Sequence, residues 1–499
     1  MPTEERTRWV WLGMLAAAAA AMHVATNGAY GLHRDELQVL DDARHLAWGF
    51  VAYPPLTPAV ERLGMAVFGS SLVGLRLFSV LAQAGVIVLA GALAAEFGGG
   101  GLAQLTAAVA VAVSPLPMFE ATEFQYTSFE MLWWLALAYC VARLLRSGNG
   151  RWWIPAGLFA GLGMMTKWTV AFGLAGLALG LVLTPSRRYF KSRWLWCGAG
   201  LAFVVFLPNL LWQVQHGWVT VHFLAHIHAR DVSEGRAQAF WRFQAAVNVE
   251  IFALPLALAG VWFLLLSSRG KQFRALAWSY LLPLAAMWLA QGRGYYVGAA
   301  YPMLLAAGGG EWERLLARFR PGWRQALAAS AFALLLAGGV LSAHVVLPWQ
   351  PLAASDYAIR ENGDLREEVG WRALAGETAR IWNSLPPSQR SQTAIVTWNY
   401  GETGAIDWYG PALGLPAAIS GVNTAWYRGY GDPPPQWLLV LGLSPDQAEE
   451  MYQGCQLAGR DGNPYGIHNE ESDQHPNIFL CGPPRAGWAE YWADHRGFG

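Results

Sequence analysis

The segment Tyr30–Pro58, YGLHRDELQVLDDARHLAWGFVAYPPLTP, determines how this chain is interpreted. It lies between two long apolar segments, yet many of its side chains are ionisable. These are His33, Arg34, Asp35, Glu36, Asp41, Asp42, Arg44 and His45. Ionisable groups beside a bilayer are costly to retain unless they serve a function. We therefore expect this segment to carry chemistry and most of the remaining chain to place it at a membrane face.

The composition of the chain is that of a polytopic membrane protein. Of its 499 residues, 54% are hydrophobic and 14% are charged, whereas about a quarter of a soluble domain is charged. The first apolar run, residues 9–26, follows Arg6 and Arg8 as a signal peptide would. We expect it to be retained as the first span, because many spans follow. The net charge of zero gives no indication of a nucleic-acid partner.

Eleven apolar ranges are candidate spans of about 20 residues or somewhat fewer. They are residues 9–26, 73–96, 102–118, 129–146, 153–167, 169–184, 195–213, 247–266, 276–290, 297–309 and 326–346. With this arrangement most arginine and lysine clusters fall on one side, which the positive-inside rule makes cytoplasmic. The opposite side receives residues 27–72, 214–245 and everything after about residue 350.

The C-terminal residues 349–499 differ from the apolar part, being rich in Asp, Glu, Asn, Gly and Pro. Two short apolar runs, Thr393–Trp398 and Trp437–Leu441, predict buried strands, and Glu402–Trp408 predicts a short helix between them. The segment Trp398–Gly404 is expected to be a loop at a strand end. We predict a small extracytoplasmic α/β domain here.

The chain is therefore expected to have two domains. Residues 1–348 would form the transmembrane domain, with residues 27–72 as its functional first outer loop, and residues 349–499 would form the soluble domain. Cys455 and Cys481 both lie in the soluble part and would pair if it faces an oxidising compartment. Pairing and free thiols are equally compatible with the sequence.

The adjacent carboxylates Asp35 and Glu36 are the first candidates for catalysis. Like-charge repulsion and burial both raise the pKa of such a pair, and Arg34 opposes both effects. A carboxylate tuned in this way can act as general base toward a hydroxyl nucleophile. The alternative is that Asp35 or Glu36 only caps an interfacial helix that begins near Leu37.

The rest of the segment supports a defined structure. The run Tyr53-Pro-Pro-Leu-Thr-Pro58 is stiff and fixes how the chain leaves the loop. Asp41, Arg44 and His45 have helical spacing, which predicts an interfacial helix. For Asp41 and Asp42 a structural, solvated helix face is the favoured interpretation.

Four motifs together resemble glycosyltransferase family 39, which includes protein O-mannosyltransferases and the aminoarabinose transferases that modify lipid A. The motifs are His33-Arg-Asp-Glu36, His45-Leu-Ala-Trp-Gly49 with Pro54-Pro-Leu-Thr-Pro58, Arg151-Trp-Trp153, and Gly161-Leu-Gly-Met-Met-Thr-Lys-Trp168. The resemblance covers residues 8–310. It implies a GT-C fold and a polyprenyl-phosphate-linked sugar as donor, used on the non-cytoplasmic face of the membrane.

By this resemblance Asp35, with Glu36 beside it, matches the essential acidic residue of the first outer loop. The implied reaction is an inverting transfer in which Asp35 accepts the proton of an acceptor hydroxyl on a lipid, glycan or protein. Fixed positive charge must then stabilise the leaving lipid phosphate. The candidate substrate-binding residues are His33, Arg34, Tyr53, Glu123, Lys167, Arg293, Tyr295 and Tyr296.

For Lys167 and Arg293 the sequence also allows an interpretation without a role in substrate binding. Lys167 interrupts an apolar segment, and such an ammonium is a functional candidate by default, although it can also snorkel to the interface. Arg293 lies between glycines in Gln291-Gly-Arg-Gly-Tyr-Tyr296, where the tyrosines offer stacking faces. An interfacial belt of aromatic residues explains that motif equally well.

One position departs from the family pattern. Related sequences often carry a second acidic residue before the fourth span, and here that position holds Thr127. Glu123 is the nearby candidate to replace it. His222 and His226 have i, i+4 spacing and could pair with Glu123 at a metal, but no third ligand is fixed by spacing. We predict no metal or other cofactor.

The favoured interpretation is thus a multi-pass glycosyltransferase of the plasma membrane, the inner membrane of a bacterium, with its active site and C-terminal domain outside. The alternative class is a transporter or lipid flippase, which would place charged or broken helices near the midplane in two related halves. A purely structural envelope protein would tolerate substitutions at Asp35, Lys167 and Arg293 alike.

Overall fold

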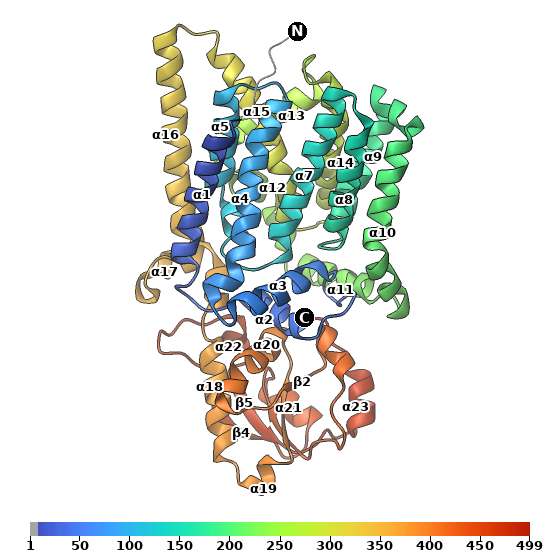
Figure 1. Cartoon of the computed structure of the whole chain (residues 1–499). Helices are drawn as coiled ribbons and strands as arrows, with labels where there is room; N and C mark the ends of the chain where they lie inside the picture. The colour runs from blue at the N-terminus through green and yellow to red at the C-terminus, as the bar shows by residue number, and fades with distance from the viewer. Residues whose placement is uncertain (1–7) are drawn as a thin grey trace.

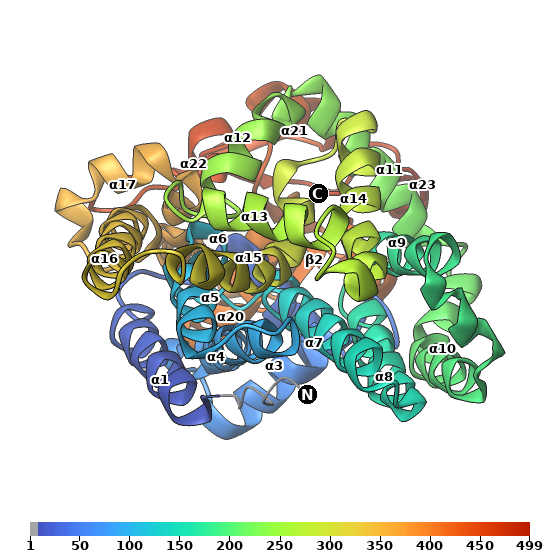
Figure 2. The same cartoon turned by 90° about the horizontal axis from the view of Figure 1, so that it is seen from above.

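The apolar runs of the first 350 residues form a body of long helices, with a smaller sheet-containing part below it (Figure 1). The structure, a computed structural model, describes residues 8–499. Arg6, which precedes the first predicted span, lies outside the described residues. Viewed from above, α10 and α16 stand at opposite edges of the helical body (Figure 2).

Each of the eleven predicted apolar ranges overlaps an α-helix. These are α1 Trp9–Thr26, α4 Leu72–Glu96, α5 Gly101–Val113, α7 Tyr126–Ser147, α8 Trp153–Met164, α9 Val170–Leu183, α10 Arg193–Gln215, α13 Leu254–Leu265, α14 Arg274–Leu289, α15 Tyr301–Leu316 and α16 Pro321–Val346. Within residues 8–499, five of them are long and apolar enough to cross a membrane, or up to six if a bent helix pair counts as one span. Several others, such as α5 and α13, are shorter. The count of eleven spans therefore stays a prediction.

Short helices form a layer between the helical body and the sheet (Figure 1). They include α2 Arg34–Arg44, α3 Leu56–Phe68 and α11 Val219–Ser233. Three further short helices are α6 Pro115–Phe119, α12 Phe240–Ala246 and α17 Asp356–Glu361. The first outer loop thus folds into two helices, α2 and α3, and α2 packs against both α3 and the C-terminal helix α20.

The C-terminal part is built around one sheet. Across the described chain its strand order is β2-β1-β3-β5-β4, with β1 parallel to β2 and β3, and β5 antiparallel to β3 and β4. The strands are β1 Thr393–Thr397, β2 Ala418–Ser420, β3 Trp437–Val440, β4 Gln456–Arg460 and β5 Asn477–Cys481. The helices are α18 Trp371–Ser384, α19 Pro387–Arg390, α20 Tyr400–Tyr409, α21 Pro445–Met451, α22 Glu470–Gln474 and α23 Trp488–Asp494.

The register of the sheet explains why its two central strands could be predicted. Ile395 on β1 pairs with Leu439 on β3, which pairs in turn with Leu480 on β5. Ile395 and Leu439 are fully buried, so these strands read as continuous apolar runs in the sequence. The predicted strands near 393–398 and 437–441 are therefore confirmed.

Two further expectations for this part have clear outcomes. Cys455 and Cys481 form a disulfide, so the pairing that the sequence left open is made. The segment Trp398–Gly404 was expected to be a loop, but α20 begins at Tyr400, earlier than the predicted helix start at Glu402. The reason is a capping box: Asn399 caps the helix and Glu402 accepts a hydrogen bond from the backbone of Asn399.

Candidate active site

The helix α2 that carries Asp35 begins one residue before it, at Arg34. His33 is the N-cap: its Nδ1 accepts a hydrogen bond from the backbone N–H of Asp35 at 3.1 Å. Glu36 Oε2 accepts from the backbone N–H of His33 at 2.8 Å, which completes a capping box. The predicted start near Leu37 was therefore about one turn too late. The capping role belongs to His33 and Glu36 and leaves the Asp35 side chain free for another function.

Glu36 is part of a buried ion-pair network. Its carboxylate accepts hydrogen bonds from Arg76 Nε at 2.8 Å, Arg76 Nη2 at 2.6 Å and the backbone N–H of Phe124 at 2.8 Å. Arg76 is fully buried and also lies 3.3 Å from Glu368. Because these contacts occupy its oxygens, Glu36 holds the loop in place, and its surroundings do not support the predicted catalytic role.

The side chain of Asp35, in contrast, lines a cavity. Its Oδ1 accepts a hydrogen bond of 2.8 Å from the hydroxyl of Tyr400, which comes from the C-terminal part. Burial alone would raise the pKa of Asp35, but the positive charge that His33 carries when protonated, the charge of Arg34 and the Tyr400 hydrogen bond hold it below the usual carboxyl value. The expected repulsion from Glu36 is not what sets this pKa, because Glu36 is bound to Arg76. Asp35 is consequently ionised at neutral pH and able to accept a proton.

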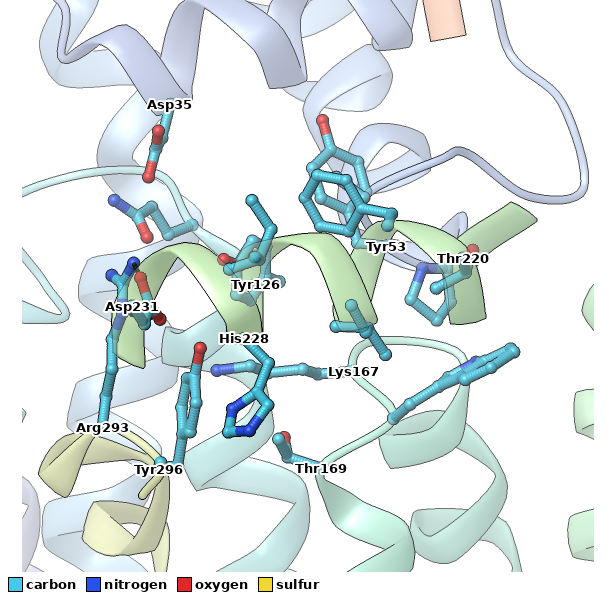
Figure 3. Close-up of a pocket in the computed structure, with 18 of the residues that line it drawn as sticks. Asp35, Tyr53, Tyr126, Lys167, Thr169, Thr220, His228, Asp231, Arg293 and Tyr296 are labelled. Carbon is cyan, nitrogen blue, oxygen red and sulfur yellow. Dashed lines mark hydrogen bonds and ion pairs between the residues drawn. The ribbon is translucent and has the colours of Figure 1, made fainter. Parts of the chain in front are cut away.

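A cavity of about 720 Å³ opens beside Asp35 (Figure 3). One wall is apolar and comes from α8, α9, α10, α11 and α14, and includes Phe172, Phe206, Leu210 and Phe223. The polar end holds Asp35, Tyr53, Lys167, Arg293, Tyr295, Tyr296 and Tyr400. A long apolar wall that ends in cationic and hydroxyl groups suits an amphiphilic ligand.

Lys167 lies at the break between α8 and α9 and points its ammonium into this first cavity (Figure 3). The nitrogen is 3.2 Å from Glu130 Oε2 but makes no hydrogen bond of good geometry within residues 8–499. The rings of Tyr126, Tyr295 and Tyr296 surround it, with centroids 4.9–5.3 Å away. This ammonium is buried at the cavity wall, and its hydrogen-bonding capacity is available to a ligand.

Arg293 is fixed by a bidentate ion pair. Its Nε and Nη2 donate to the two oxygens of Asp231 on α11, both at 2.6 Å. The remaining nitrogen, Nη1, has no hydrogen bond to the described part of the chain. A bidentate ion pair fixes the orientation of the guanidinium group. Arg293 therefore presents its positive charge in a fixed position at the polar end of the cavity.

A second cavity, of about 750 Å³, meets the first at Asp35. Six residues line both cavities: Arg34, Asp35, Gln125, Arg236, Arg293 and Tyr295. The second cavity extends between α6, α12 and α16 and combines apolar side chains such as Leu341 and Val345 with Glu120, Glu250, Glu361 and Asp364. The two compartments therefore share one carboxylate, that of Asp35, and three guanidinium groups.

Among the glutamates near Thr127, Glu120 lines the second cavity, together with Thr127 itself. Glu123 lines neither of the two cavities, and its carboxyl group lies 3.2 Å from His33 Nδ1. Burial, followed by the negative charges of Asp364 and Glu36, raises the pKa of Glu123 well above its ordinary value. The predicted substrate-binding role thus fits Glu120 better than Glu123.

The remaining predicted residues are placed as follows. His33 lines the second cavity, and Tyr53 lines the first while donating a 2.7 Å hydrogen bond to Asp42. His222 and His226 are exposed on α11. In the part of the chain that the structure describes, no three His, Cys, Asp or Glu side chains cluster as metal ligands would.

Two residues with important contacts at the site, Arg76 and Tyr400, were not predicted from the sequence. Arg76 lies within the apolar run of α4, and the reasoning that singled out Lys167 as a cation in an apolar segment applies to it equally. Tyr400 gave no such signal, because its partner Asp35 is 365 positions away in the chain.

Comparison with known proteins gives three kinds of similarity. Residues 52–212 match the sequence model of the dolichyl-phosphate-mannose-protein mannosyltransferase family. The lipid A galacturonosyltransferase RgtD of Rhizobium johnstonii is 27% identical over 234 residues. That alignment covers 45% of this chain and 46% of the relative, so only about half of the relative's length is matched.

Two solved structures share the fold. The crystal structure of ArnT from Cupriavidus metallidurans bound to undecaprenyl phosphate has a TM-score of 0.55 at 14% identity, over 95% of this chain and 98% of that chain. The arabinofuranosyltransferase AftD from Mycobacteria has a TM-score of 0.56 at 14% identity, over 96% of this chain and 40% of that chain. The predicted resemblance to GT-C glycosyltransferases is confirmed, and the chain is a membrane protein with that fold.

Proposed function

We propose that this GT-C membrane protein transfers a sugar from a polyprenyl-phosphate donor to a hydroxyl on a lipid or glycan, on the non-cytoplasmic face of the plasma membrane. Asp35 is the general base. The observation that carries this proposal is the position of Asp35: an ionised carboxylate where two cavities meet. A transfer reaction needs such a meeting point, because donor and acceptor must be held within reach of the same base.

The charges of the two cavities favour one assignment of substrates. The first cavity is lined by five cationic side chains, Arg34, Lys167, Arg230, Arg236 and Arg293, against two carboxylates, Asp35 and Asp231. The second is lined by four arginines against five carboxylates. A phosphate is stabilised by net positive charge, so the first cavity is assigned to the polyprenyl-phosphate donor and the second to the acceptor. The ArnT relative was crystallised with undecaprenyl phosphate, which agrees with a donor carrier of this class.

In the proposed reaction, Asp35 removes the proton of the acceptor hydroxyl while the oxygen attacks the anomeric carbon of the sugar. The new carbon–oxygen bond forms as the bond to the phosphate oxygen breaks, and the electron pair leaves with the polyprenyl phosphate. Lys167 and Arg293 stabilise the charge that develops on that phosphate. Attack opposite the leaving group inverts the anomeric carbon.

The transporter alternative is less well supported. A transporter needs its charged groups along a path through the membrane, near the midplane. Here Asp35 lies on α2, in the layer between the helical body and the sheet, and it shares the first cavity with Arg293, Tyr53 and Tyr400. That layer suits chemistry at a membrane surface.

The first test is complementation of a deletion strain. Wild-type protein, Asp35→Asn and the exposed control Asp446→Asn are produced at equal levels, and envelope lipids and glycans are compared by mass spectrometry. We expect wild type and the control to restore a species heavier by one sugar, and Asp35→Asn to reduce it at least ~1,000-fold because no base remains. A product made by Asp35→Asn would overturn the mechanism, and identical profiles with and without the gene would favour the transporter.

The donor assignment has a separate test. Undecaprenyl phosphate binding to the purified protein is measured by native mass spectrometry for Lys167→Met and for Lys191→Met, which alters an exposed lysine of the predicted cytoplasmic side. Loss of the cavity ammonium should weaken binding about tenfold, and the control should bind as wild type does. Unchanged binding by Lys167→Met would remove Lys167 from the donor site.

A further inference from the structure

We propose that the C-terminal domain completes the active centre, with Tyr400 as the positioning residue that orients Asp35 for proton transfer. This inference rests on the proposed function, since it assigns a partner to the proposed base. It gives the domain a direct role in the chemistry, whereas the sequence predicted only a loop at a strand end for the segment that carries Tyr400.

The contact is local and specific. The Tyr400 hydroxyl donates to Asp35 Oδ1 at 2.8 Å, and Tyr400 itself lines the first cavity. The other oxygen, Oδ2, accepts no hydrogen bond from residues 8–499. One oxygen is therefore held, and the other is left to accept the proton of the acceptor hydroxyl.

The position of Tyr400 follows from its helix. As the first residue of α20, it directly follows the cap residue Asn399, whose side chain accepts from the backbone N–H of Gly401 at 2.6 Å. The capping box fixes where the helix begins and so fixes the direction of the Tyr400 side chain. Helix α20 continues directly from β1, so the central sheet sets its place.

Two glycines allow α20 to lie against α2. A Cβ atom at Gly404 would be 2.5 Å from the carbonyl oxygen of Leu37 on α2. A Cβ at Gly401 would be 3.1 Å from the Cβ of Arg34 and 2.6 Å from the ring of Trp371. Only a residue without a side chain permits this approach without displacement of backbone. The spacing brings the Tyr400 hydroxyl within hydrogen-bonding distance of Asp35.

Ion pairs hold α2 to the C-terminal domain at both ends of the helix. At its start, Arg34 pairs with Glu470 on α22 and lies over the ring of Tyr400, 5.7 Å from its centroid. Toward its end, Asp41 pairs with Arg428, whose Nη1 is 3.0 Å from Asp41 Oδ1. These contacts join segments that are far apart in the chain, so the loop and the domain act as one unit around Asp35.

The ionisation of Asp35 reports on this contact. The groups that act on it from the surrounding elements are His33, Arg34, Tyr53, Glu123, Tyr126, Arg293 and Tyr400. Of these, Tyr400 donates the side-chain hydrogen bond, which favours the charged form and lowers the pKa of Asp35. Its removal should raise that pKa.

The test uses the full chain with Tyr400→Phe, which keeps the ring and removes only the hydroxyl. The matched control is Tyr452→Phe, which removes a buried hydroxyl of the same domain that contacts Tyr491 and Trp398. Transfer rates are measured against pH with membranes of the deletion strain as acceptor and the polyprenyl-phosphate-sugar fraction extracted from that strain as donor. Wild type and Asp35→Asn are run in parallel.

For Tyr400→Phe we expect kcat to fall about tenfold with the KM for donor nearly unchanged, and the acid limb of the pH profile to move up by about 1 pH unit. Tyr452→Phe should keep the wild-type limb. A Tyr400→Phe profile identical to wild type would overturn the positioning role, as would a fall in rate with no movement of the limb. A wild-type protein that makes no product would instead overturn the proposed function itself.

Discussion

The neighbouring residues Asp41 and Asp42 on α2 differ in protonation, although both were expected to have the same structural role. Asp41 is ionised and paired with Arg428. Asp42 has a different partner and accepts a hydrogen bond from the hydroxyl of Tyr53. Burial, followed by the charge of Asp41, raises the pKa of Asp42 to about 8. The charge of Asp41 is balanced by Arg428, whereas Asp42 carries no charge at neutral pH because it keeps its proton.

This difference predicts that Asp42→Asn stabilises the protein. In the unfolded chain Asp42 ionises near its ordinary pKa of 3.8, whereas in the folded protein it keeps its proton until about pH 8. The contribution of Asp42 to folding stability is therefore complete below the unfolded pKa and is lost progressively as the pH rises to about 8. A difference of one between the folded and unfolded pKa corresponds to about 1.4 kcal/mol, so the penalty at pH 8 is on the order of a few kcal/mol. Asparagine keeps the acceptor for Tyr53 and removes the penalty.

The measurement is thermal unfolding of the purified protein, followed by tryptophan fluorescence at about pH 5.5 and about pH 8. The midpoint of Asp42→Asn should exceed that of wild type by several degrees at the higher pH and by less at the lower pH. The exposed control Asp446→Asn should match wild type at both. A variant less stable than wild type at the higher pH would show that Asp42 is ionised in the fold.

At the scale of elements, the pairing of α2 with α20 is the contact on which the site depends, and it predicts different effects for two helical glycines. Gly404→Ala on α20 places a methyl group 2.5 Å from the carbonyl oxygen of Leu37 and must separate the helices. Gly376→Ala on α18 meets no atom within 4 Å. Alanine in an open helix position stabilises by up to about 1 kcal/mol, so only the first change should be harmful.

The comparison is made on both stability and transfer. Gly404→Ala should lower the unfolding midpoint by several degrees, consistent with overpacking costs of about 1–3 kcal/mol, and lower the transfer rate as Tyr400 moves from Asp35. Gly376→Ala should match or slightly exceed wild type in both. Equal behaviour of the two variants would mean that α2 and α20 are not closely packed.

Elements could be predicted from the sequence where local pattern decides the structure. The apolar runs form a helix in every expected range, and the buried runs around Ile395 and Leu439 form strands. Asp35 was singled out because charge beside apolar segments is conspicuous. Tyr400 and Glu36 show the limit: the first contacts Asp35 from 365 positions away, and the second is bound by Arg76, a contact that the sequence pattern did not reveal. Such roles depend on tertiary packing, which a single sequence pattern does not encode.

At the scale of the whole molecule, the candidate site occupies the layer between two bodies of different character. The helical body supplies Lys167 and the apolar wall of the first cavity, and the sheet-containing part supplies Tyr400. The disulfide between Cys455 and Cys481 agrees with an oxidising compartment for that part. Together with the basic loops at the opposite ends of the helices, this favours an outer location for the sheet and the candidate site.

Orientation can be tested by thiol labelling with a membrane-impermeant maleimide in intact spheroplasts. In a background with Cys197→Ala, which removes the exposed free thiol, single cysteines are introduced as Ser388→Cys on α19 and Ser147→Cys at the end of α7. Figure 1 shows α19 at the extremity of the molecule opposite the helical body. Ser147 lies among Arg143, Arg146 and Arg151, on the side expected to be cytoplasmic. Ser388→Cys should be labelled almost completely in spheroplasts, whereas Ser147→Cys should react only after the membrane is permeabilised. The reverse pattern would place Asp35 on the cytoplasmic side and rule out a donor sugar presented from outside.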